Sequence, residues 1–121
     1  MHRVTVHAGD VIYRQGEASA SAYMILSGEI GMERGDITIP SGPGELIGFS
    51  VLFDRPYGST ATALGDATLL AFSRKELRTL IRTDPYEAIK IVEAIIAVLG
   101  RVSEELERRN PSGSPGPPAG G

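Results

Sequence analysis

The chain has 121 residues and a formal charge of −3, because 12 Lys and Arg residues stand against 15 Asp and Glu residues. One domain is expected at this length, and the mildly acidic balance argues against nucleic-acid binding by this chain alone, which normally needs a clustered basic surface. The absence of cysteine excludes disulfides, thiolate metal sites and cysteine nucleophiles, so the 41% of hydrophobic residues must supply the stability.

From Arg3 to Ser73, turn residues recur at short intervals and separate brief apolar runs such as Tyr23 to Leu26. This pattern predicts about seven or eight short antiparallel strands, arranged as a sandwich or barrel. The core of this barrel is expected to bury four large side chains that belong to such runs, namely Leu26, Leu52, Leu69 and Phe72.

The segment from Ser41 to Leu64 breaks this rhythm. A glycine-rich turn is followed by about one helical turn at 48–54, a loop and a strand. Backbone amides at the start of such a turn favour anions, and the hydroxyls of Ser59 and Thr60 follow nearby. The alternative, a tight barrel corner that needs glycine, explains the glycines but not the short helix.

Two helices are predicted after Phe72. Ser73 and Glu76 have the spacing of a capping box, which indicates a helix from about Arg74 to Arg82. Asp84 and Pro85 then open a long helix that runs to about Arg109.

The long helix has two apolar stripes at helical spacing. If the first stripe rests on the barrel, the second needs a partner, and a homodimer through the same helix of another subunit is favoured over burial of the first turns all round. The first stripe contains Ile89, Val92, Ile96, Leu99 and Leu106, and the predicted dimer interface contains Ile91, Ile95, Val98 and Val102.

The last twelve residues, 110–121, hold four of the eight prolines and are expected to form a disordered tail or linker. The predicted domain therefore covers 1–109, with a strand-rich part at 3–73 and helices at 74–109. The first seven residues lack a signal-peptide pattern, and the apolar run from Ala94 to Leu99 is far too short to span a bilayer. We expect a cytoplasmic location without membrane insertion.

Catalytic and metal-binding residues are not predicted. The only histidines, His2 and His7, have an odd spacing on one predicted strand, which points them to opposite faces. A cupin-like enzyme, the third alternative for function, needs several converging imidazole or carboxylate ligands. The sequence also has no nucleophile-elbow pattern and no histidine inside the candidate site region that could act as a base.

Three motifs in chain order carry a family resemblance. Gly9 to Glu17 matches "G-D-x-I-x-x-x-G-E", Tyr23 to Ile30 matches "Y-x-I-x-x-G-x-[IV]", and Gly42 to Leu64 takes the place of a phosphate-binding cassette. Over its first 109 residues the chain resembles a cyclic nucleotide-binding domain of the Crp/Fnr-type regulators. The resemblance implies a mainly β fold, a jelly-roll-like double-stranded β-helix or β-roll, followed by a short and a long α-helix.

The resemblance also implies a ligand site, with Gly48, Phe49, Ser50, Val51, Arg55, Tyr57, Gly58, Ser59 and Thr60 as candidate ligand-binding residues. The cassette departs from the family at two anchors, because Phe49 replaces the glutamate that holds the ribose and Tyr57 replaces the arginine that pairs with the phosphate. Such charged hydrogen bonds are worth roughly 1.5–3 kcal/mol each, so weak or no cAMP binding is expected. Arg55 is a candidate substitute, although a solvated loop arginine is the more common case.

The leading hypothesis is a dimeric, non-enzymatic sensory or regulatory domain. It needs no cofactor, and cAMP, cGMP or another small anionic molecule is the candidate ligand. No helix-turn-helix is present in the sequence, so the output would lie in another chain, in a longer protein or in the long helix itself. The second hypothesis keeps the fold but makes the pocket vestigial, which leaves a dimerisation or docking module.

Overall fold

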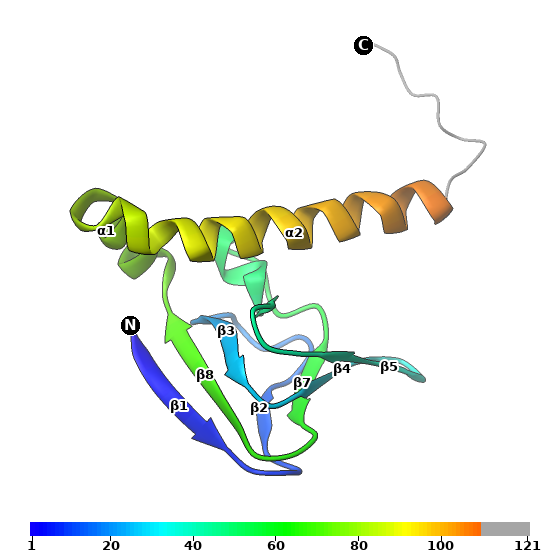
Figure 1. Ribbon diagram of the computed structural model, residues 1–121. Helices are drawn as coiled ribbons and strands as arrows, with labels where there is room; N and C mark the ends of the chain where they lie inside the picture. The colour runs from blue at the N-terminus through cyan, green and yellow to red at the C-terminus, as the bar shows by residue number, and fades with distance from the viewer. Residues whose placement is uncertain (110–121) are drawn as a thin grey trace.

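A computed structural model describes residues 1–109, with side chains described up to Arg101 (Figure 1). The predicted tail at 110–121 and the side chain of Val102 lie outside the described residues.

The strands form two antiparallel sheets of four strands each. The first sheet has the order β1-β8-β3-β6, with β1 at His2–Val6, β8 at Ala67–Phe72, β3 at Ala22–Ser27 and β6 at Leu46–Ile47. The second has the order β2-β7-β4-β5, with β2 at Val11–Tyr13, β7 at Thr60–Ala63, β4 at Ile30–Arg34 and β5 at Ile37–Ser41. Two antiparallel sheets followed by two helices confirm the predicted fold class.

The core between the sheets is mainly aliphatic, as predicted, but it also contains the buried rings of Tyr13 and Tyr57. Leu69 and Phe72 are fully buried, which confirms two of the four expected core residues, and Leu52 is half-buried. The expectation for Leu26 was wrong, because its side chain is 38% exposed. Neighbouring residues of a strand face opposite sides, and Ile25 takes the inward position on β3.

Both predicted helices are present. Helix α1 spans Arg74–Thr83, and its N-terminus has the predicted capping box, in which the Ser73 side chain accepts from the Glu76 backbone N–H at 3.0 Å. Helix α2 spans Pro85–Arg109 and crosses one end of the sheets (Figure 1). Neither helix, over the described residues, is long and apolar enough to cross a membrane.

A second apolar cluster lies beneath α2. A 3₁₀ helix, η1, at Phe49–Phe53, sits between α2 and the sheets (Figure 1) and contributes Val51. The other members come from both helices and from the first sheet, namely Ala22, Leu46, Phe72, Leu77, Ile91, Ala94 and Val98. Helix α2 is therefore held to the β-roll by its own apolar face.

The assignment of the two stripes of α2 was wrong. Ile91 and Val98, predicted for a dimer interface, pack on the β-roll, and Val98 is only 6% exposed. Ile95 is half-buried against the same cluster. Three residues predicted to face the barrel are exposed instead and form the exposed stripe, namely Ile89, Ile96 and Leu99, with Ile96 62% exposed. Val92 is half-buried, and the side chain of Leu106 lies outside the described residues.

Small residues explain which stripe faces inward. Ala88 and Ala94 are buried on the same side of α2 as Ile91 and Val98. Alanine lets a helix approach a sheet closely, whereas the stripe of Ile89 and Ile96 would hold it farther away. Counting large apolar residues alone overlooks these alanines.

Substitutions on the buried and the exposed stripe of α2 should have different effects on stability. Ile91→Ala is expected to lower the free energy of unfolding by about 2–5 kcal/mol, because it leaves a cavity in the cluster under α2. Ile96→Ala, the matched control on the exposed stripe, should change it by less than about 1 kcal/mol in the monomer. Urea unfolding followed by circular dichroism measures both, and equal losses would contradict the observed packing.

Candidate functional site

A cavity of about 150 Å³ lies where the second sheet, η1 and α2 meet. Of the predicted cassette residues, Gly48, Phe49, Ser50, Tyr57, Gly58 and Ser59 line it. Strands β2, β4, β5 and β6 and helix α2 add Tyr13, Met32, Arg34, Ser41, Leu46, Ile47 and Val98.

Three predicted site residues do not line this cavity. Val51 is buried in the cluster under α2, and the Thr60 hydroxyl accepts a hydrogen bond from the Gln15 backbone at 3.0 Å. Arg55 is exposed, and its recorded bonds are made by its backbone, which accepts from the Ser19 hydroxyl at 2.7 Å and donates to Ser50 at 3.1 Å. The structure thus matches the solvated alternative for Arg55.

Tyr57 occupies the position at which the resemblance places a phosphate-binding arginine, and it is buried. Its hydroxyl donates to the Ser21 carbonyl at 2.7 Å and accepts from the backbone N–H groups of Ser21 at 3.2 Å and Ala20 at 3.3 Å. A phenol has one proton and two lone pairs, so these three bonds occupy the whole group. Tyr57 has no donor left for an anion.

The ring of Tyr57 also has a structural role. It stacks on Tyr13 with a centroid distance of 3.8 Å and an interplanar angle of 12°. Burial raises the pKa of Tyr13 well above its usual value, and Tyr57 adds to the rise. The Tyr13 hydroxyl therefore stays protonated at the wall of the cavity. The sequence predicted Tyr13 only as part of a strand. Its place in the cavity wall depends on Tyr57, which lies 44 residues away in the chain.

Gly48 makes room for this tyrosine pair. Its φ is +71°, in the left-handed region, and a Cβ there would lie 3.2 Å from the Tyr13 ring, the Tyr57 ring and the Ser21 carbonyl. The steric need for glycine agrees with the barrel-corner alternative, and the predicted short helix is present as η1, which begins at the next residue. Anion binding by its amides stays a prediction.

Phe49 presents an aromatic ring where the resemblance places a carboxylate. It lines the cavity and packs edge-to-face on the exposed Phe53, with centroids 6.0 Å apart and planes at 89°. A phenyl ring accepts no conventional hydrogen bond from a ribose hydroxyl. This side of the cavity is apolar.

Arg34 is the cavity residue that the sequence analysis missed. Its Nε donates to the Gly58 carbonyl at 3.2 Å, across the gap between β4 and the loop before β7. Strand alternation is the signal that could have found it, because Ile30, Met32 and Arg34 follow one another at a period of two. Ile30 is fully buried, Met32 is half-buried and Arg34 is exposed, so the row leads from the core outward and reaches solvent at Arg34, which lines the cavity.

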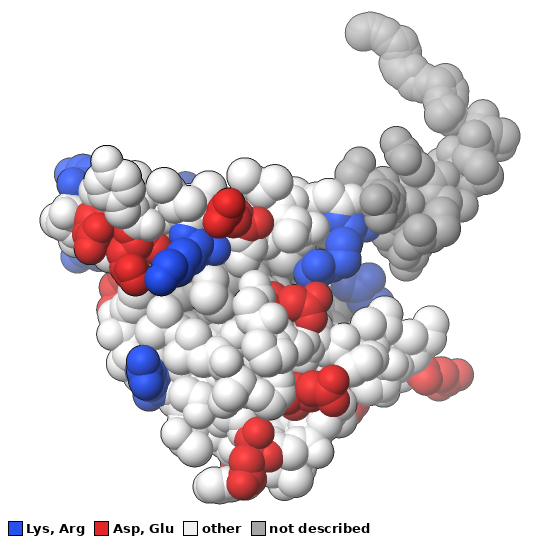
Figure 2. All heavy atoms as spheres, in the orientation of Figure 1, with Lys and Arg blue, Asp and Glu red and all other residues white. Residues whose placement is uncertain are grey.

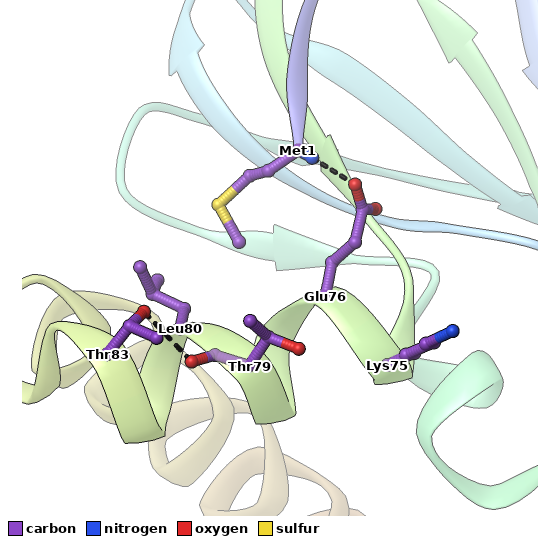
Figure 3. Close-up of a pocket in the computed structure, with 6 residues that line it drawn as sticks. All are labelled: Met1, Lys75, Glu76, Thr79, Leu80 and Thr83. Carbon is purple, nitrogen blue, oxygen red and sulfur yellow. Dashed lines mark hydrogen bonds and ion pairs between the residues drawn. The ribbon is translucent and has the colours of Figure 1, made fainter.

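A larger hollow of about 510 Å³ lies along α1 (Figure 3) and is lined by Met1, Lys75, Glu76, Thr79, Leu80 and Thr83. Figure 3 shows the Met1 amine facing Glu76 and the Thr83 hydroxyl bonded to its own helix, at 3.0 Å from the Thr79 carbonyl. The Met1 amine, the Glu76 carboxylate and the Thr83 hydroxyl of this hollow are thus already paired. Within the described part of the chain, three or more metal-ligating side chains do not cluster anywhere.

Comparisons with known proteins agree with the fold described above. The family model described as "Cyclic nucleotide-binding domain" matches residues 3–84. Among curated proteins, a lysophospholipase NTE1 of Pyricularia oryzae is 29% identical over 107 residues, which are 83% of this chain. The chain spans only 7% of the length of that protein.

Two solved structures have related sequences as well as the same fold. The catabolite activator protein of Thermus thermophilus is 28% identical with a TM-score of 0.72, over 90% of this chain and 55% of that one. The N-terminal domain of a transcriptional regulator from Streptomyces coelicolor A3(2) is 27% identical with a TM-score of 0.64, over 87% of this chain and 78% of that one.

The Tyr57 hydroxyl should contribute to stability. Tyr57→Phe is expected to lower the free energy of unfolding by about 1–3 kcal/mol, because it leaves the Ser21 carbonyl and two backbone N–H groups without their partner. Tyr86→Phe, at an exposed tyrosine of α2, is the matched control and should change little. Chemical unfolding of both variants is the measurement, and an unchanged Tyr57→Phe protein would contradict this role.

Proposed function

The chain belongs to the cyclic nucleotide-binding domain family, and we propose that it is a non-enzymatic regulatory domain that binds a small ligand in the cavity beneath η1 and α2. In this proposal the affinity for cAMP is weak or absent. The related structures support a regulatory role, since they come from a catabolite activator protein and a transcriptional regulator.

The commitment of the Tyr57 hydroxyl is the observation that carries the proposal. At the position of the family arginine, all three hydrogen bonds of this group go to the backbone of residues 20 and 21. Hydrogen bonds to a charged group are worth roughly 1.5–3 kcal/mol, and about 1.4 kcal/mol corresponds to a tenfold change in affinity. Loss of a bidentate arginine contact therefore weakens phosphate binding by a hundredfold or more.

The small size of the cavity also supports weak binding of cAMP. Small-molecule sites usually enclose about 300–1,000 Å³, whereas this cavity holds about 150 Å³. A whole nucleotide would fit only after η1 or α2 moved. A smaller ligand would fit the cavity as it stands.

Helix α2 is the proposed output element. Val98 lines the cavity, so a ligand there would touch the helix directly. Three residues further on, Arg101 lies 3.4 Å from the Glu45 carboxylate, which anchors the helix to the loop before β6. Occupancy would change the contacts of α2 at both points.

Nucleic acid is not the proposed partner. On the face drawn in Figure 2, basic and acidic side chains are interspersed along the two helices, without one continuous basic patch. Phosphate backbones are held by clustered positive charge. Any output on DNA would thus come from another chain or another part of a longer protein.

A dimerisation or docking module with a vestigial pocket is the second candidate. The exposed stripe of Ile89, Ile96 and Leu99 favours it, because aliphatic side chains in a row on a helix usually meet a partner. A second copy of α2 would bury this stripe around a two-fold axis. A homodimer is compatible with both candidates, so ligand binding discriminates between them.

Isothermal titration calorimetry tests the affinity for cyclic nucleotides. Titration of cAMP and of cGMP into the domain is expected to give dissociation constants weaker than about 10 micromolar, since neither family anchor is available. A constant at or below that value would overturn the proposal of weak binding. If Arg55→Gln then abolished the binding, Arg55 would be the substitute anchor.

Analytical ultracentrifugation tests the dimer. The wild-type domain is expected to sediment as a dimer at tens of micromolar, and Ile96→Glu should shift it to monomer, because like charges would meet in an apolar seam. Ile37→Glu is the matched control, since Ile37 on β5 is 63% exposed and lies off the stripe. A monomeric wild-type domain would overturn the dimer.

A further inference from the structure

We propose that Arg34, on β4, is the anion anchor of the cavity and that the ligand is a small organic anion, a phosphate ester or a carboxylate. The inference rests on the proposed function, because it names the residue that holds the charged end of the proposed ligand. It places the positive charge on the sheet and not on the loop that carries Tyr57.

Only one N–H donor of the Arg34 guanidinium has a hydrogen-bond partner among the described residues. Its Nε–H is bonded to the Gly58 carbonyl at 3.2 Å, which fixes the plane of the group beside the loop before β7. An arginine carries five N–H donors, and within the described residues no carboxylate lies close enough to pair with this one. The remaining donors are free for a ligand.

The lining around Arg34 supplies both polar and apolar partners. Ser41, Ser50 and Ser59 line the same cavity, and serine hydroxyls complement an arginine in holding an oxyanion. The lining also includes three apolar residues, Met32 beside Arg34 on β4, and Phe49 and Val98 from the two helical elements. A ligand with one anionic end and an apolar or planar body matches this division.

The apolar surface continues beyond the cavity past Arg34. In the hairpin, Arg34 is paired with Ile37 and Met32 with Ile39, and residues paired in this way share one face of the sheet. Ile37 and Ile39 are both exposed. Arg34 is itself exposed, so a ligand held by its guanidinium could rest on Ile37 and Ile39 as well as on the cavity lining.

Gly58 lies beside the guanidinium of Arg34. Its carbonyl accepts from Nε, and a Cβ at this position would be in ordinary contact with Nη2, at 3.4 Å. The Gly58 and Ser59 amides are thus suitable reporters of an anion that binds at Arg34.

The experiment is a set of nuclear magnetic resonance titrations on the ¹⁵N-labelled domain. Inorganic phosphate, cAMP and adenosine are added separately to wild type, to Arg34→Gln and to Arg55→Gln. Phosphate carries the charge alone, adenosine carries the apolar body alone, and cAMP carries both. Arg55→Gln is the matched control, because it removes an arginine that lies outside the cavity.

We expect phosphate and cAMP to cause saturable shifts at Gly58 and Ser59 in wild type and in Arg55→Gln. In Arg34→Gln, both anions should bind about 10- to 100-fold more weakly, as for loss of a hydrogen bond to a charged group. Adenosine should bind equally to all three proteins. Arg34→Lys should recover part of the affinity for anions, which a purely structural role in holding Gly58 would not explain.

Thermal unfolding of Arg34→Gln completes the test, and an unchanged midpoint shows that the variant is folded. Absence of saturable anion shifts at Gly58 and Ser59 in wild type would overturn the role of Arg34, as would equal anion affinities in wild type and Arg34→Gln. In either case, cavity shifts with adenosine would leave the proposed function standing. The proposed function fails too if none of the three probes reaches the cavity.

Discussion

The contact of Tyr13 and Tyr57 around Gly48 is the constraint on which the site depends. It joins β2, the loop at residues 20 and 21, the start of η1 and the loop before β7. The backbone of Tyr57 strengthens this junction, since its carbonyl accepts from Gly16 at 2.8 Å and its N–H donates to Glu17 at 3.0 Å. A residue bound in this way positions the cavity wall and is not available to recognise a ligand.

Because position 57 holds a neutral tyrosine and not an arginine, the loop before β7 places no positive charge at this point of the cavity. With the loop position neutral and Phe49 apolar, Arg34 is the charged side chain among the lining residues. It is the exposed last residue of β4, and its backbone is paired with Ile37 of β5. An anchor on a paired strand is positioned more rigidly than one on a loop.

Sequence predicted those features that depend on local signals. The capping box of Ser73 and Glu76 placed the start of α1, and Asp84 with Pro85 placed the start of α2. Long-range packing decided the rest. The inward stripe of α2 depends on Ala88 and Ala94, and the role of Tyr57 depends on a loop 36 residues earlier in the chain, so neither could be inferred from spacing along one segment.

The two faces of α2 connect the proposed ligand site to the proposed dimer. Val98 touches the cavity, while Ile96 and Leu99 on either side of it in sequence belong to the exposed stripe. A helix moves as a stiff unit over such a short distance, so a ligand that displaces Val98 also displaces the stripe. If both sites operate, their binding free energies are coupled, and by thermodynamic linkage dimerisation changes ligand affinity by the same factor as the ligand changes dimerisation.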